Sequence, residues 1–457
     1  MKNNKIIFVQ GLGVIGSINA YCIAYKKKNF DVIGFEAKNK NGKNIIEKIN
    51  SGHFPFNTTD KKINSIVKTV YKKKNFIVTN DYKLIKKKKS PEVILCCLAL
   101  KYYQNKNKQI IENKKFIESF KEIISTIDEK TLIIVQTSLP PGFSKKYLLP
   151  LAIKKLKQNT KGKYNTPLFS YSYERVTPGR NLTNSFLKMP RVFACNNLKA
   201  KKNFVLFFSK ILNFKNSLLA LDDITECETG KILENSYRAV NIAFINEWMD
   251  YSKKLKLNLN KILKYIRLRP THSNIRYPGL GVGGFCLTKD PIFGRYSHNE
   301  IFNYKNDKFL FSTNSISVNK KMILHTIEIM KEKLKNLRDK KILLVGVTYL
   351  EGSDDIRSSP SINLGKILET RFKSKVTYYD KFYFKHTDNY NQVNFNKDFF
   401  DAIIFCVKGS FSKKILKSKI IKKTRLVLDT NQIFDNRTIE QIKNINKKIT
   451  VLGNYNT

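Results

Sequence analysis

The sequence predicts an α/β protein with two Rossmann-like, doubly wound domains joined by a central helical segment that contains a long helix. Short β-branched runs alternate with longer helical patterns in the first third of the 457 residues, and a second such series begins after residue 340. The region between them, from about Asp222 to Lys335, is mainly helical in pattern. We therefore expect three domains, at residues 1–215, 216–325 and 326–457.

The predicted strands follow one another as parallel βαβ units. In the first series they are Lys5–Gln10, Asp31–Glu36, Phe76–Thr79, Glu92–Cys97 and Leu132–Gln136. In the second they are Lys341–Gly346, Lys375–Tyr379, Ala402–Val407 and Arg425–Asp429. Proteins built in this way commonly carry their active site in the cleft between domains, so we expect the functional residues there.

The composition excludes a disordered chain and disfavours a nucleic-acid binder. Hydrophobic residues make up 42% and aromatic residues 12% of the sequence, which indicates a folded core. The 85 Lys and Arg residues exceed the 36 Asp and Glu residues by a formal charge of +49, but most are Lys scattered in short runs. Arg is absent before Arg175, and seven Arg residues lie between Arg175 and Arg276. The bulk charge is therefore background, and the Arg positions are the more informative signal.

Cysteine, histidine and hydropathy patterns predict a cytoplasmic protein without a metal site or a membrane anchor. The seven cysteines are an odd number with no metal-ligand spacing, which is typical of reduced thiols. The five histidines are isolated from one another. No apolar stretch reaches the roughly 18–20 residues of a membrane span, and Gln10, three glycines and Asn19 interrupt the segment that resembles a signal peptide.

A glycine motif near the N-terminus predicts a dinucleotide site. Gly11-Leu12-Gly13-Val14-Ile15-Gly16 follows a predicted strand and opens a helix, and Glu36 ends the next strand. The glycines permit a tight turn, the approach of a pyrophosphate and close packing of helix on strand. The carboxylate of Glu36 would accept hydrogen bonds from ribose hydroxyls and repel a 2′-phosphate, so we expect NAD rather than NADP. A purely structural glycine turn is the weaker alternative.

A helix predicted from Asp223 to about Lys254 carries a polar stripe. Glu228, Lys231, Asn235 and Arg238 recur at steps of three, four and three, which places all four on one face. Asp223 and Glu226 resemble a capping box at its start. The stripe is either the solvated side of the helix or a set of cations and amides that faces an anionic ligand.

A second glycine-rich segment leads directly into a cysteine. Pro278-Gly279-Leu280-Gly281-Val282-Gly283-Gly284-Phe285-Cys286 precedes Lys289 and Asp290. The glycines let backbone wrap closely around a ligand, and a helix start and an ammonium group would both favour the thiolate of Cys286. A buried structural cysteine beside a turn is the alternative.

These motifs, in this order, resemble the UDP-glucose/GDP-mannose dehydrogenases nearly from end to end. The resemblance extends to further segments: Thr137-Ser138-Leu139-Pro140-Pro141-Gly142, Tyr173-Glu174-Arg175-Val176-Thr177-Pro178-Gly179, Cys227-Glu228-x-x-Lys231-x-x-x-Asn235 and Asp354-Asp355-Ile356-Arg357-Ser358-Ser359-Pro360. The motifs around Glu174, Asn235 and Cys286 are most similar to those of the UDP-N-acetylhexosamine 6-dehydrogenases, which act on UDP-ManNAc or UDP-GlcNAc.

The resemblance implies an NAD-dependent oxidation of a sugar C6 alcohol to the uronate, in two steps at one site. It implies Cys286 as the covalent nucleophile and Lys231 with Asn235 as stabilisers of the oxyanion, with Lys231 also taking a proton. Asp290, Glu174 and Ser138 would support hydrolysis, and Ser138 would also contact the cofactor. The other implied contacts are Arg357 toward the cofactor, and Arg175, Val176, Arg238, Arg276, Gly283 and Tyr349 toward the sugar nucleotide.

The resemblance also assigns roles to the three domains. Residues 1–215 would bind NAD, 216–325 would carry the Cys286 loop and a dimer interface, and 326–457 would bind the UDP-sugar. We expect a homodimer or higher homo-oligomer without nucleic-acid partners, active in surface polysaccharide precursor synthesis.

Departures from the family pattern leave the identity of the substrate sugar open. Leu350 replaces a usual Lys, Ala99 a usual Thr and Tyr173 a usual Pro, and His272 lies near the position of an Arg that Arg269 or Arg276 would replace. A UDP-glucose 6-dehydrogenase is the main alternative. A single-step Rossmann dehydrogenase and a non-catalytic binding protein remain further hypotheses.

Overall fold

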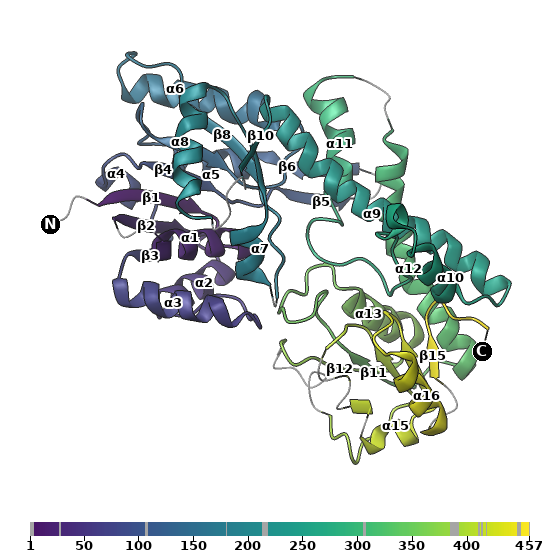
Figure 1. Ribbon diagram of the computed structural model, residues 1–457. Helices are drawn as coiled ribbons and strands as arrows, with labels where there is room; N and C mark the ends of the chain where they lie inside the picture. The colour runs from purple at the N-terminus through teal and green to yellow at the C-terminus, as the bar shows by residue number, and fades with distance from the viewer. Residues whose placement is uncertain are drawn as a thin grey trace. The chain divides into compact units, whose positions relative to one another are not determined.

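The computed structural model describes most of the chain, at residues 4–26, 29–105, 108–179, 181–212, 218–304, 308–383, 393–409, 412, 415–416, 418–445 and 449–456. These residues divide into two units (Figure 1). The first unit is Met1–Glu234 with Phe293–Asp307, and the second is Asn235–Ile292 with Lys308–Thr457. The boundary expected near residue 215 lies outside the described residues, and the division into three domains stays a prediction.

The first unit is built on an eight-stranded sheet in the order β10-β9-β8-β7-β4-β1-β2-β3. The strands are β1 (Lys5–Gln10), β2 (Phe30–Phe35), β3 (Phe76–Thr79), β4 (Val93–Cys96), β7 (Leu132–Val135), β8 (Leu168–Tyr173), β9 (Arg191–Cys195) and β10 (Leu218–Ala220). All neighbours are parallel except β8 and β9. A separate antiparallel hairpin joins β5 (Lys101–Asn105) to β6 (Lys108–Glu112). The five strands expected here are present to within one residue at each end.

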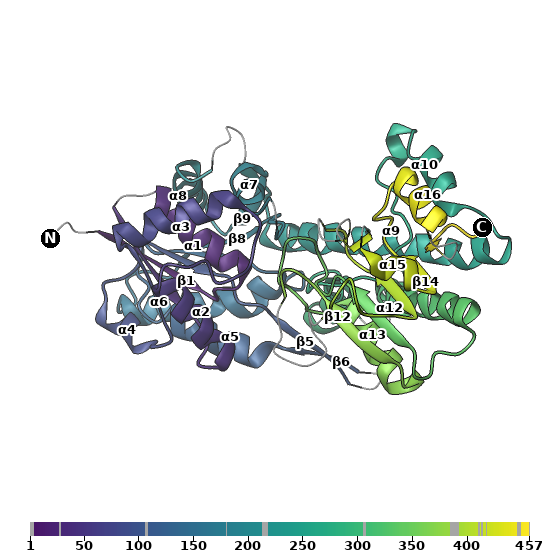
Figure 2. The same cartoon turned by 90° about the horizontal axis from the view of Figure 1, so that it is seen from below.

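Helices cover both faces of this sheet because its central strands are apolar on both sides. In β1, Ile7 and Val9 belong to one buried cluster and Phe8 to the other. On the face that carries Ile7 and Val9, Figure 2 shows the helices α1 (Val14–Lys26), α3 (Lys61–Lys73), α7 (Leu182–Lys188) and α8 (Leu198–Ser209). On the face that carries Phe8 it shows α4 (Lys83–Lys87), α5 (Asn113–Ile123) and α6 (Leu149–Asn159). At the edge, α2 (Lys40–Asn50) is tied to β3 by two hydrogen bonds between the Asn50 amide and Val78.

The second unit contains a five-stranded, wholly parallel sheet in the order β12-β11-β13-β14-β15. Its strands are β11 (Lys341–Val345), β12 (Lys375–Tyr379), β13 (Ala402–Phe405), β14 (Leu426–Asp429) and β15 (Ile449–Val451). One face packs on α10 (Leu259–Ile266), α12 (Leu310–Leu334) and α13 (Pro360–Phe372), and the other on α15 (Lys419–Lys423) and α16 (Asn436–Ile445) (Figure 1). The expected fold class, with two doubly wound sheets, is confirmed.

The long helix is α9 (Ile224–Lys254), which has 31 residues. Its first turn is capped as expected: the Thr225 N–H donates to the Asp223 carboxylate at 2.7 Å, and the Asp223 N–H donates to the Glu226 carboxylate at 3.3 Å. Through the described part of the chain, no helix combines the length and the apolar character that a membrane span requires. The short helix α11 (Phe293–Tyr296) belongs to the first unit.

Candidate active site

The glycine loop of the first unit is shaped to receive a pyrophosphate. It lies at the carboxyl end of β1, where the strand order changes direction between β2 and β4. Gly11 has a φ of +81°, and a Cβ atom on Gly16 would lie 1.9 Å from the Gly11 carbonyl oxygen. A Cβ on Gly13 would meet open space, with nothing within 4 Å. Val14 and Ile15 begin α1, so the helix N-terminus points at the space that Gly13 leaves free.

Glu36 follows β2 directly and holds this loop in place. One carboxylate oxygen accepts the Leu12 N–H at 2.6 Å, and the other accepts the Ala37 N–H at 2.8 Å. Each oxygen keeps further acceptor capacity, because an ionised carboxylate offers about four lone-pair sites. The residues of the loop therefore fit a dinucleotide, and the role of Glu36 as acceptor for the ribose hydroxyls stays a prediction.

A buried carboxylate fixes the loop that follows β7. Ser138 is half-buried in this loop, and the Gly142 and Ser144 N–H groups both donate to Glu228, at 2.6 and 3.0 Å. Glu228 is fully buried, and burial raises its pKa to about 7 although these N–H groups act in the opposite direction. The motif pattern placed Glu228 on the polar stripe but gave it no role. Its role in holding the loop depends on backbone partners that are more than 80 residues away in the sequence.

Glu174, Arg175, Val176 and Lys231 lie together at the end of β8. The Glu174 carboxylate accepts the Val176 N–H at 2.5 Å, and the Lys231 ammonium donates to the Glu174 carbonyl at 3.0 Å. Arg175 pairs with Glu234 at 2.9 Å. The ring of Tyr173, the residue that departs from the family pattern, lies within 5.6 Å of both cations. The first unit thus collects two cations and two carboxylates at the carboxyl end of β8.

One helical turn after Lys231, Asn235 belongs to a buried polar cluster of the second unit. Its amide donates to Asp290 at 2.7 Å, and Asp290 also pairs with Lys289 at 2.5 Å. All three side chains are buried. The solvated-face interpretation of the stripe is therefore wrong for Glu228 and Asn235, while Arg238 is exposed.

Cys286 is exposed and starts a helical turn, so the buried-cysteine alternative is wrong. Its carbonyl accepts the Lys289 and Asp290 N–H groups, at 3.1 and 2.8 Å. The glycines before it allow close packing on the loop after β11: a Cβ on Gly283 would lie 2.5 Å from that of Tyr349. Gly284, with a φ of +82°, donates its N–H to the Arg357 carbonyl at 2.8 Å.

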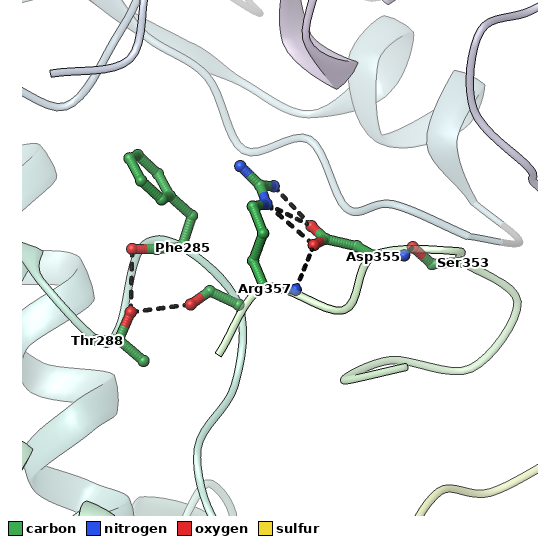
Figure 3. A network of polar contacts seen from close by, with 6 residues as sticks. Phe285, Thr288, Ser353, Asp355 and Arg357 are labelled. Carbon is green, nitrogen blue, oxygen red and sulfur yellow. Dashed lines mark hydrogen bonds and ion pairs between the residues drawn. The ribbon is translucent and has the colours of Figure 1, made fainter. Parts of the chain in front are cut away.

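Figure 3 shows how the side chains around this turn are held. Arg357 makes several hydrogen bonds to Asp355, the shortest at 2.6 Å, and its guanidinium lies 5.2 Å from the Phe285 ring. Thr288 donates to the Gly284 and Phe285 carbonyls, at 2.9 and 3.3 Å. The turn that presents Cys286 is therefore fixed from both sides.

The charges near Cys286 come from separate segments of the second unit. Burial, with contributions from Asp355 and Cys286, raises the pKa of Tyr349 to about 12, while Arg357 and Arg238 act against it. Burial alone would lower the pKa of Arg357, but hydrogen bonds to Asp355 keep it above its usual value. Cys286, Tyr349, Arg238 and Arg357 therefore share one electrostatic environment.

A group of arginines and a cavity complete this part of the second unit. Burial lowers the pKa of Arg276, and the nearby charges of Arg238 and Arg267 lower it further. A cavity of about 280 Å³ lies at the carboxyl ends of β11 and β13, where the strand order changes direction. Its lining includes Gly281, Tyr349, Leu350, Ser361 and Lys408.

Comparisons with known proteins identify the family of the chain. Residues 5–211 match the NAD binding domain of the UDP-glucose/GDP-mannose dehydrogenase family, and residues 225–313 match its central domain. The chain is similar to UDP-N-acetyl-D-mannosamine dehydrogenases of Methanocaldococcus jannaschii (28% identity over 98% of this chain and 96% of the relative) and Pyrococcus horikoshii (27% over 81% and 82%).

A solved structure shares the fold. The structure of UDP-D-ManNAc dehydrogenase from Pyrococcus horikoshii matches with a TM-score of 0.77 and 23% identity, over 99% of this chain and all of that one. The two family matches together cover well over half of the sequence. The chain therefore belongs to the UDP-glucose/GDP-mannose dehydrogenase family and is an NAD-dependent nucleotide-sugar dehydrogenase.

Proposed function

We propose that this protein oxidises the C6 alcohol of a UDP-N-acetylhexosamine, UDP-ManNAc or UDP-GlcNAc, to the uronate in two steps. The observation that carries the proposal is an exposed cysteine on a fixed glycine turn, beside Arg357 and one turn before the buried Asp290. A single alcohol oxidation needs no such nucleophile, whereas a cysteine can hold the aldehyde covalently for a second oxidation to the acid. The names of the relatives favour the N-acetylhexosamine, and UDP-glucose is the alternative substrate.

In the first oxidation, Lys231 takes the proton of the C6 hydroxyl, and Lys231 and Asn235 stabilise the developing oxyanion. Both side chains lie on α9 one turn apart, and Asn235 is held in one orientation by Asp290. NAD, bound at the glycine loop, accepts a hydride in each of the two oxidations.

In the second oxidation, the Cys286 thiolate adds to the C6 aldehyde and forms a thiohemiacetal. Loss of a hydride from C6 converts this adduct into a thioester, and water then cleaves the carbon–sulfur bond to release the carboxylate and restore the thiol. We propose that Glu174, Asp290 and Ser138 orient the water and accept its proton. The covalent adduct also prevents release of a reactive aldehyde.

The anionic part of the substrate requires cations and an enclosed space. Arg238, Arg267 and Arg276 supply three guanidinium groups, and the charges of Arg238 and Arg267 lie close enough to Arg276 to lower its pKa. We propose that the UDP moiety occupies the cavity beside Tyr349, where Lys408 provides a cation near the position that Leu350 leaves uncharged.

The decisive experiment is an NADH-release assay over UDP-ManNAc, UDP-GlcNAc, UDP-GalNAc, UDP-glucose and GDP-mannose. We expect two NADH per sugar and a uronate product with UDP-ManNAc or UDP-GlcNAc. A stoichiometry of one NADH per sugar would instead indicate a single-step dehydrogenase. Activity confined to UDP-glucose would show that the protein is a UDP-glucose 6-dehydrogenase, the alternative function.

We propose that the chain forms at least a homodimer through α9. Tyr237, Phe244, Trp248 and Tyr251 are each about half exposed, at spacings that form one stripe along the helix. Residues 232–252 contain no Lys in a chain of net charge +49, so two copies would meet there without lysine repulsion. We propose the cytoplasm as the compartment, because an odd number of cysteines with no metal-ligand spacing is typical of reduced thiols.

Trp248→Glu is expected to convert the dimer into a monomer in light scattering coupled to size exclusion, because a carboxylate would be buried in an apolar interface. Leu198→Glu, at an exposed apolar residue of α8, is the matched control and should remain dimeric. A dimeric Trp248→Glu protein would contradict this interface.

A further inference from the structure

The two oxygens of the buried Glu228 carboxylate hold two different points of the loop that follows β7. Oε2 accepts the Gly142 N–H at 2.6 Å, and Oε1 accepts the Ser144 N–H at 3.0 Å. Protonation of a carboxylate turns one of its oxygens into a donor and a poorer acceptor. A proton on either oxygen of Glu228 therefore weakens one of the two bonds to the loop.

Glu228 has an unusual pKa for a carboxylate. Burial raises that pKa to about 7, Asp223 raises it too, and hydrogen bonds from Ser144 and Gly142 act in the opposite direction. Within the described part of the chain, no cation pairs with this carboxylate, and Lys145 pairs with Asp223 instead. Near pH 7 Glu228 is therefore present in both forms, and the ionised form predominates only above that pH.

The charged groups around this carboxylate belong to the start of α9 and to the segment after the loop. Lys145 pairs with Asp223, and Lys146 donates to the carbonyls of residues 300–301 at 2.8 and 3.0 Å. Cys227 is the preceding residue on α9, and burial raises its pKa to about 12, so it stays a neutral thiol near pH 7. Among these groups, Asp223 is the one whose charge acts on the buried carboxylate.

Hydroxyl groups hold the rest of the same loop. The Tyr171 hydroxyl donates to the Thr137 carbonyl at 2.8 Å, and the Ser297 hydroxyl donates to the Pro141 carbonyl at 2.6 Å. Serine and tyrosine hydroxyls ordinarily keep their protons near neutral pH. Of these described contacts to the loop, those made by Glu228 are therefore the ones that change with pH in this range.

The position of the loop in the sheet places it near a bound cofactor. With the adenosine ribose at Glu36 beyond β2 and the pyrophosphate at the glycine loop beyond β1, a dinucleotide extends across β4 toward β7. Neighbouring strands lie about 4.8 Å apart, so the end of β7 is roughly 10 Å from that of β1, within the length of a dinucleotide. The loop, with its half-buried Ser138, therefore lies on the nicotinamide side.

We propose that Glu228 is a positioning residue that makes the affinity for NAD depend on pH. In its ionised form it holds both N–H groups and keeps the loop in the conformation that binds the nicotinamide half. Protonation frees one N–H group, loosens the loop and lowers the affinity. This inference rests on the proposed place of NAD at the glycine loop, and it is independent of which sugar is oxidised.

The test is a titration of the full-length protein with NADH, followed by the fluorescence of the nucleotide. Without a sugar substrate, the proposed chemistry of Cys286 and Lys231 does not contribute. We expect the Kd to fall about fivefold to tenfold between pH 6 and pH 8, with a midpoint near 7. By linkage, binding near pH 7 should also release protons, which calorimetry in buffers of different ionisation enthalpy detects.

Glu228→Gln keeps the size of the side chain and one acceptor oxygen but cannot ionise. Its amide nitrogen faces one of the two N–H groups, so the variant resembles the protonated form. We expect it to bind NADH at every pH with the weaker Kd that the parent shows at pH 6, and to release no protons. Glu118→Gln, at an exposed position of α5, makes the same chemical change and should keep the pH dependence of the parent.

Asp223→Asn is a second variant, which leaves Glu228 in place. Asparagine retains the capping oxygen at the start of α9, whereas the charge that raises the pKa of Glu228 is lost. The midpoint of the Kd profile should therefore move down by roughly half a pH unit. This shift keeps the proposal testable if Glu228→Gln does not fold.

The outcomes separate this inference from the function on which it rests. A parent protein that binds NADH with one Kd from pH 6 to pH 8, or a Glu228→Gln protein that keeps the pH dependence, would overturn the role of Glu228 alone. An unshifted midpoint in Asp223→Asn would do the same, because the dependence would then come from another group. A parent protein that binds no NADH at any pH would overturn the proposed cofactor site itself.

Discussion

Cys286→Ser is expected to stop the reaction after the first oxidation, so that uronate formation falls on the order of 10³-fold or more. A serine hydroxyl at this position is a far weaker nucleophile than a thiolate, because it stays protonated at neutral pH. The turn itself should persist, since its hydrogen bonds are made by the backbone of residue 286 and by Thr288. The measurement is uronate and NADH per UDP-sugar over a full time course.

Cys195→Ser is the matched control for this experiment. Cys195 is a half-buried thiol at the end of β9 in the first unit, outside the proposed chemistry, and its substitution should leave the yield of two NADH per sugar intact. Uronate formation at the parent rate by Cys286→Ser would exclude the covalent step. It would leave the family membership unaffected.

The central strands were predictable because their signal is local. Runs such as Ile6–Val9 and Ile342–Val345 are apolar on both faces, as buried parallel strands must be. The strand β8 was not predicted, because Leu168–Tyr173 alternates serine with aromatic residues. The Ser170 and Ser172 hydroxyls are buried in hydrogen bonds to the Ile133 and Val192 carbonyls, which only the assembled sheet supplies. The short β10 and β15 likewise have little pattern of their own.

The candidate site likewise combines local sequence signals with contacts between distant residues. The glycine motif and the Cys286 turn could be recognised because their function depends on residues adjacent in sequence. Glu228 could not be assigned a role from sequence, because its importance comes from distant partners. Its carboxylate accepts the Gly142 and Ser144 N–H groups in the loop beyond β7. Buried charged side chains in otherwise apolar runs are the sequence signal that would identify such residues.

Lys231→Met is expected to lower kcat for NADH formation by about 10²–10³-fold, with a smaller change in KM for the UDP-sugar. The Lys231 amine is proposed to take the C6 proton, and the ammonium group that results is proposed to stabilise negative charge on that oxygen. Both effects are larger in the transition state than in the bound substrate. Stability should change little, because among the described residues the Lys231 ammonium makes one hydrogen bond, to the Glu174 carbonyl, and lies over the Tyr173 ring. Methionine keeps the aliphatic length on the same helix.

Lys254→Met, at an exposed position near the end of the same helix, is the control for loss of one positive charge and should retain the parent kcat. Because Lys231 also contacts the backbone of Glu174, its loss could act through the hydrolysis step instead. The two routes predict different intermediates: a defect in the first oxidation leaves Cys286 unmodified at steady state, whereas a defect in hydrolysis leaves it acylated. A Lys231→Met enzyme with a kcat within twofold of the parent would show that Lys231 takes no part in the reaction. An acylated Cys286 at steady state would show that Lys231 acts in hydrolysis, through its contact with Glu174.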